Sequence, residues 1–135
     1  MIKKFSHVGV AVKDLEKSTE IFSRLFGVKS VETEEVADQR VRLAFFRVGD
    51  TSVELTEATS DDSPIAKFIE KRGEGVHHLS FEVDDIRTEL KRLKAEGFIL
   101  IDEEPRRGAG GYWIAFLHPK STNGVLVEIS EKIRA

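Results

Sequence analysis

Two histidines and two glutamates occupy matching places in the two halves of this 135-residue chain. His7 and His78 each open a run of alternating residues and lie 71 positions apart. Glu54 and Glu128 lie in the matching sequences Val-Glu-Leu and Val-Glu-Ile, 74 positions apart. Imidazole nitrogens and carboxylate oxygens together suit divalent ions such as Co²⁺, Ni²⁺, Mn²⁺, Zn²⁺ or Fe²⁺. The spacing therefore indicates one metal site that draws on both halves.

A single histidine on an apolar strand is more often a core residue than a ligand, and a single glutamate near a strand end is usually solvated. Four such residues in matched places make coincidence a weak explanation, so we favour the metal. His77 alternates with His78 and should point the other way, as a structural residue. His118 precedes Pro119 in a turn, where it is a turn residue or a substrate contact, and we favour the turn.

The elements that must position these residues also occur twice, in the order βαβββ. Each candidate histidine strand is followed by Asp14 or Asp85, which can cap a helix that ends at Gly27 or Gly97. Between the halves, Ser63, Pro64 and Gly73 mark a connecting helix. The remaining predicted strands are residues 28–35, 41–48, 51–56, 98–101, 112–117 and 125–130.

We therefore predict an α+β fold in which two tandem βαβββ modules form a cupped mixed sheet with the helices outside. A single domain should span residues 1–135, with module one at about 3–57, the connecting helix at about 63–72 and module two at about 75–131.

Composition and charge exclude several classes of partner. A net charge of −3 without a basic stripe argues against nucleic acid. No apolar run approaches the roughly 18 residues of a membrane span, and residues 1–5 lack the apolar core of a signal peptide. The absence of cysteine excludes thiolate ligands. We expect a cytoplasmic protein without a membrane partner.

The loop at 102–111 contains Arg106, Arg107 and the sequence Gly108-Ala109-Gly110-Gly111. It is not a phosphate-binding loop, because no Gly-Lys-Ser/Thr follows. A flexible turn and a functional loop stay equally open here. The two arginines and Lys120 could meet an anionic ligand, although surface charges are usually only solvated.

Five motifs spanning nearly the whole chain resemble the vicinal oxygen chelate superfamily and, within it, the methylmalonyl-CoA epimerase family. They are residues 7–12 (HVGVAV), 62–68 (DSPIAKF), 75–78 (GVHH), 108–111 (GAGG) and 116–128 (FLHPKSTNGVLVE). The resemblance implies epimerisation of methylmalonyl-CoA in propionate metabolism, with a divalent metal (Co²⁺ first, with Ni²⁺, Mn²⁺ or Zn²⁺ as alternatives). It also implies a homodimer, for which the apolar residues of the middle strands and helices give further reason.

The resemblance implies metal ligands at His7, Glu54, His78 and Glu128. The implied substrate contacts are Gln39, Gly110, Gly111, His118 and Lys120. The acid that some family members present on the third strand falls near Leu43 here, so we assign proton transfer to Glu128 for one face of the substrate and to Glu54 for the other. The ligand set also resembles that of bacterial lactoylglutathione lyase, which stays an alternative, as does a non-catalytic binding protein of the same superfamily.

Overall fold

The computed structural model describes residues 1–134, which divide into two compact units. Unit 1 comprises residues 1–7 together with those from 78 onward, and unit 2 comprises residues 8–77. Strands β1 (Ile2–Ala11) and β5 (Gly75–Val83) each pass from one unit into the other. The single domain expected from the sequence stays a prediction, and each unit is described by itself.

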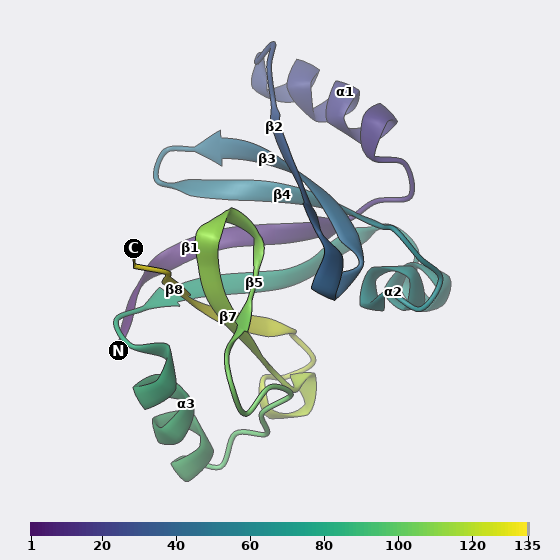
Figure 1. Cartoon of the computed structure of the whole chain (residues 1–135). Helices are drawn as coiled ribbons and strands as arrows, with labels where there is room; N and C mark the ends of the chain where they lie inside the picture. The colour runs from purple at the N-terminus through teal and green to yellow at the C-terminus, as the bar shows by residue number, and fades with distance from the viewer. Residues whose placement is uncertain (135) are drawn as a thin grey trace. The chain divides into compact units, whose positions relative to one another are not determined.

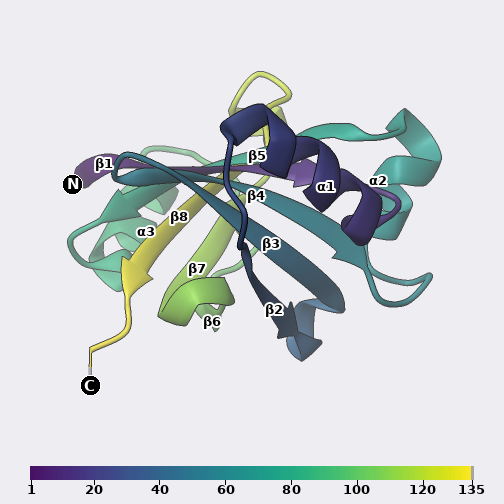
Figure 2. The same ribbon diagram turned by 90° about the horizontal axis from the view of Figure 1, so that it is seen from above.

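Unit 2 holds an antiparallel sheet of β2 (Glu32–Val36), β3 (Val41–Val48) and β4 (Thr51–Ala58), with β1 beside β4. Helix α1 (Leu15–Phe26) covers one face of this sheet (Figure 2). Alternate residues of β3 meet the helix, because Ala44 and Phe46 are buried in one cluster with Leu55. The intervening residues Leu43 and Phe45 must therefore face the opposite side of the sheet.

Both helices of unit 2 begin and end where the sequence predicted. Asp14 accepts a hydrogen bond from the Lys17 N–H at 3.1 Å, and Gly27 ends α1 with a φ of 69°. Helix α2 (Pro64–Arg72) has Pro at its start and Ser63 as its cap, with the Ile65 N–H donating to Ser63 Oγ at 3.2 Å. Side-chain caps of this kind supply partners for N–H groups that the helix cannot satisfy.

Unit 1 contains strands in the order β1-β5-β8-β7-β6, with β6 at Arg106–Arg107, β7 at Tyr112–Leu117 and β8 at Val127–Lys132. The β5–β8 pair is parallel, whereas β7 runs antiparallel to both of its neighbours. Helix α3 (Ile86–Ala95) packs on β7 and β8 (Figure 1). Its apolar side meets Val83, Ala115 and Ile129 in one buried cluster.

The two modules repeat a specific contact as well as an order of elements. In unit 2 the Leu15 N–H at the start of α1 donates to Glu57 Oε2 at 2.9 Å. In unit 1 the Ile86 N–H at the start of α3 donates to Glu131 Oε1, also at 2.9 Å. A carboxylate beside the positive end of a helix dipole stabilises both helix starts. The predicted βαβββ order is confirmed in both modules.

One predicted strand is wrong. Residues 98–101 form only an isolated bridge between Leu100 and Leu117, and β6 lies instead inside the loop predicted at 102–111. The carboxylate of Asp102 accepts the Phe116 N–H at 2.9 Å and also pairs with Arg106 at 3.1 Å. The Asp102 side chain thus accepts a backbone N–H of β7 that antiparallel pairing with residues 98–101 would otherwise use. Short 3₁₀ turns occur at Ala37–Gln39 (η1), Ala109–Gly111 (η2) and Pro119–Ser121 (η3).

Among residues 1–134, no helix combines the length and the apolar character that crossing a bilayer would require.

An ion pair between the buried Glu89 and the exposed Arg92 of α3 predicts a pH-dependent contribution to stability. Glu89 is buried, and the Arg92 guanidinium donates to both of its carboxylate oxygens at 3.0 Å. These bonds lower the pKa of Glu89 despite its burial. A depressed folded-state pKa stabilises the protein above the unfolded value near 4.3, and this stability is lost as the pH falls through the folded value. Glu89→Gln should therefore lower the free energy of unfolding by about 1 kcal/mol at pH 7 and by progressively less in acid.

Urea denaturation at pH 7 and at pH 3.5 measures this difference. Glu70→Gln is the matched control, because Glu70 is exposed on α2 and should change the free energy of unfolding by less than about 0.5 kcal/mol. An equal loss at both pH values for Glu89→Gln would show that packing, and not charge, accounts for its effect.

Candidate metal centre

Three strands of unit 1 bring His7, His78 and Glu128 together. These residues come from β1, β5 and β8, and their ligand atoms all lie within 4.8 Å of one another. The two Nε2 atoms of His7 and His78 are 3.1 Å apart, and His7 Nε2 is 3.4 Å from Glu128 Oε1. Two imidazole nitrogens and a carboxylate oxygen converging on one point form a donor set suited to a divalent cation.

The cluster is shielded from solvent. The relative exposure of His7 is 9%, that of His78 is 8% and that of Glu128 is 4%. Burial lowers the pKa of His7 to about 4, so its imidazole is neutral near pH 7. A neutral imidazole is the form that binds metal. Ser6 Oγ lies 3.1 Å from His7 Nδ1, so a hydrogen bond at that nitrogen leaves Nε2 turned toward the cluster.

Two further residues on the same face were missed by the sequence analysis. Ser80 is the register partner of Glu128 in the β5–β8 pair and lies two residues after His78. Its hydroxyl is buried and has no hydrogen-bond partner among the described residues. Phe116 is the register partner of Glu128 in β7. Its ring packs edge-on against the His78 ring, with the two ring centroids 5.5 Å apart. The alternation of side chains along β5 and β7 gives the face on which each residue lies. Only the strand pairing shows that this is the face of Glu128.

Glu54 lies in unit 2, on β4, and is also buried. Its relative exposure is 8%, and Ser52 Oγ donates to its Oε2 at 3.1 Å. Burial raises the pKa of Glu54 to about 7, the Ser52 hydroxyl opposes this shift, and the charge of Glu34 adds to it. The place of Glu54 as the fourth ligand stays a prediction.

The remaining predicted site residues lie in turns. Gly110 and Gly111 have φ values of 70° and 78° in η2, a conformation that suits glycine. His118 Nδ1 accepts the Lys120 N–H at 3.0 Å, so His118 holds the turn that starts η3. Gln39 closes η1 in unit 2 and is half-buried. Their contacts with a substrate stay predictions.

His77 has a structural environment in unit 2. Its ring packs edge-on against Phe68 of α2 at 4.9 Å, and burial lowers its pKa to about 4. This agrees with the expectation that His77 and His78 serve different purposes.

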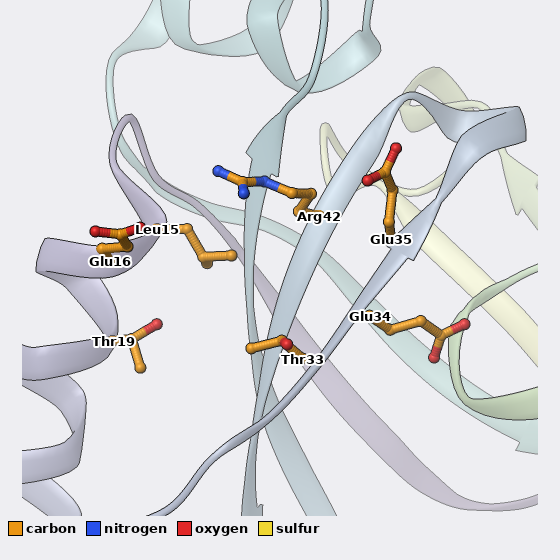
Figure 3. A pocket seen from close by; sticks show the side chains of 7 residues that line it. All are labelled: Leu15, Glu16, Thr19, Thr33, Glu34, Glu35 and Arg42. Atoms are coloured by element: carbon orange, nitrogen blue, oxygen red, sulfur yellow. The ribbon is translucent and has the colours of Figure 1, made fainter.

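A separate cavity of about 550 Å³ lies between α1 and the sheet of unit 2 (Figure 3). Leu15, Glu16, Thr19, Thr33, Glu34, Glu35 and Arg42 line it. None of the four proposed ligands lies among these residues, and Arg42 is already paired with Glu57. The cavity therefore does not coincide with the metal centre.

Known proteins resemble this chain over most of its length. Residues 6–116 match the Glyoxalase/Bleomycin resistance protein/Dioxygenase superfamily. The mitochondrial methylmalonyl-CoA epimerase of Dictyostelium discoideum is 40% identical over 97% of this chain and 80% of its own length. The ethylmalonyl-CoA/methylmalonyl-CoA epimerase of Cereibacter sphaeroides is 38% identical over 97% of this chain and 99% of its own.

A solved structure extends the similarity to the fold. A Streptomyces coelicolor methylmalonyl-CoA epimerase variant in complex with 2-nitronate-propionyl-CoA matches with a TM-score of 0.93 at 34% identity. The match covers 98% of this chain and 96% of the other, which confirms the predicted α+β fold class. The chain therefore belongs to the Glyoxalase/Bleomycin resistance protein/Dioxygenase superfamily and, within it, to the methylmalonyl-CoA epimerase family.

Proposed function

We propose that this chain is a methylmalonyl-CoA epimerase, which interconverts the (R) and (S) forms of its substrate. The observation that carries the proposal is the nearly full-length similarity to two epimerases at 38–40% identity. The buried cluster of His7, His78 and Glu128 supports it, because the reaction requires a site that stabilises negative charge developing on the substrate. A location in the cytoplasm and a role in propionate metabolism stay predictions.

The donor atoms present fit a divalent ion. His7, His78 and Glu128 would hold it, and we propose Glu54 as the fourth ligand on the strength of the internal repeat and the family resemblance. A bound divalent ion would act as a Lewis acid toward oxygen atoms of the substrate. Co²⁺ is our first candidate, with Ni²⁺, Mn²⁺ and Zn²⁺ as alternatives.

The residues of the chain must remove the proton from the α-carbon and return it to the opposite face. We assign one face to Glu128, whose carboxylate accepts the proton while the C–H electron pair moves toward the thioester carbonyl. The burial of Glu128 keeps bulk water from competing for this proton. The assignment of Glu54 to the other face stays a prediction.

The substrate must also be held, and we propose Gln39, Gly110, Gly111, His118 and Lys120 for this purpose. The exposed Lys120 ammonium suits an anionic group.

The metal centre predicts which histidine substitutions remove the ion. The purified protein should bind about one divalent ion per chain, and His7→Ala or His78→Ala should abolish high-affinity binding because each removes one of few ligands. His77→Ala is the matched control and should leave metal content unchanged. Elemental analysis and calorimetric titration with Co²⁺ measure both quantities. Loss of metal from the His77 variant but not from the His78 variant would contradict the assignment.

The assignment of Glu128 predicts a separation of two activities. Glu128→Gln keeps an oxygen ligand but cannot accept a proton, so inversion should fall on the order of 10²–10⁴-fold. With the other base intact, the variant should still exchange the α-hydrogen of one epimer with solvent deuterium without inverting it. Mass spectrometry and a chiral assay with each epimer measure exchange and inversion, with metal content verified. Wild-type inversion by Glu128→Gln would exclude Glu128 as a base.

We also propose a C2 homodimer, the commonest soluble oligomer. Helix α1 supports this, because Ile21 and Leu25 remain 53% and 69% exposed. Sedimentation velocity at micromolar concentration should give twice the mass of the 15.2 kDa chain. A monomer under these conditions would contradict the proposal.

A further inference from the structure

A buried hydroxyl group lies beside the metal centre of unit 1 without a hydrogen bond. Ser80 of β5 has a relative exposure of 0%, and its Oγ atom has no hydrogen-bond partner among residues 1–134. Buried hydroxyl groups are normally satisfied, because taking one out of water without a partner is unfavourable. The Ser80 hydroxyl therefore points to a partner that it meets when the site is in use.

Complete burial limits what that partner can be. A molecule that enters from solvent does not reach the Ser80 hydroxyl, because the side chain exposes no surface. The same argument separates Ser80 from residues that bind substrate directly, which must present an accessible atom. The partner must then be a group of the protein itself on the same face of the sheet.

Glu128 is the member of the metal cluster beside which Ser80 lies. The two residues are register partners in the parallel β5–β8 pair, so their side chains leave the sheet side by side. Neighbouring strands are about 4.8 Å apart, whereas residues two apart on one strand, such as Ser80 and His78, are about 6.6 Å apart. A carboxylate has two oxygen atoms, so it can direct one to a cation and accept a hydroxyl donor on the other.

The internal repeat indicates that packing alone does not require this hydroxyl. Gly9 lies 71 positions before Ser80, the same separation that relates His7 to His78. Module one therefore has no side chain at the matching place. The hydroxyl belongs to module two alone, which is the module that supplies Glu128.

We propose that Ser80 is a positioning residue of the metal centre, which donates a hydrogen bond from its hydroxyl to the Glu128 carboxylate. This inference rests on the proposed metal centre and epimerase function. The hydrogen bond restricts rotation of the carboxylate and keeps one of its oxygens directed at His7 and His78. Hydrogen bonds that orient metal ligands in this way contribute to metal affinity.

Ser130 provides a matched control within the same unit. It follows Glu128 by two residues on β8 and is equally buried, at 1% relative exposure. Its hydroxyl donates to the Phe81 carbonyl oxygen at 3.5 Å, and its register partner on β5 is Glu82. Ser130→Ala therefore removes the same atom from an equally buried place without affecting the proposed contact.

The test is calorimetric titration of Co²⁺ into EDTA-treated wild type, Ser80→Ala and Ser130→Ala. Ser80→Ala should raise the Kd for Co²⁺ on the order of 10–100-fold, the usual effect of losing a hydrogen bond to a metal ligand. It should also shift the visible absorption bands of bound Co²⁺, because these bands report the geometry of the ligands. Ser130→Ala should keep the wild-type affinity and bands.

Thermal unfolding of the EDTA-treated proteins separates positioning from packing. The Ser80 hydroxyl has no partner among the described residues, so Ser80→Ala removes no existing hydrogen bond. Its unfolding midpoint should therefore stay at the wild-type value. A midpoint lowered by Ser80→Ala would show that the hydroxyl serves packing and would overturn the proposal.

The other outcomes distinguish this proposal from those on which it rests. A wild type that binds no Co²⁺ would overturn the metal centre. A wild type that binds Co²⁺ but releases no deuterium from C2-labelled methylmalonyl-CoA would overturn the epimerase function. Wild-type Co²⁺ affinity in Ser80→Ala, or an equal loss of affinity in Ser130→Ala, would overturn only the role of Ser80.

Discussion

The alternation of side chains along the strands is the constraint on which the chemistry of this protein depends. In unit 1, Val83 and Ile129 pack beneath α3, while His78 and Glu128 occupy the other face of the same two strands. A shift of the β5–β8 register by one residue would bury the chemical groups under the helix and turn the core residues outward. The packing of α3 therefore fixes the register that brings the ligand atoms together.

Burial of polar groups is the energetic consequence of this arrangement. Taking an imidazole or a carboxylate out of water is unfavourable, and the fold does so for His7, His78 and Glu128 within 4.8 Å. The close approach of the two imidazoles and the carboxylate compensates part of that cost, and a divalent cation would compensate more. A buried polar cluster stabilises the fold less than apolar residues of the same size would. Clusters of this kind are typical of functional sites.

The duplicated module repeats specific contacts as well as its order of elements. The contacts that hold each helix to its sheet are repeated, as Glu57 with Leu15 and Glu131 with Ile86 show. The glutamate of the last strand is buried in both modules, Glu54 at 8% relative exposure and Glu128 at 4%.

The sequence by itself determined the two modules, the helix boundaries and three residues of the metal cluster. Helix caps such as Asp14 and Ser63 act within a few residues, and the internal repeat marks His7, His78 and Glu128 without any knowledge of contacts. Only the tertiary structure decided which residues lie beside them. Ser80 and Phe116 have no local signal, because their importance comes from strand pairing between distant segments. The predicted strand at 98–101 is wrong for a different reason, since the carboxylate of the next residue, Asp102, accepts the Phe116 N–H that pairing with β7 would have used.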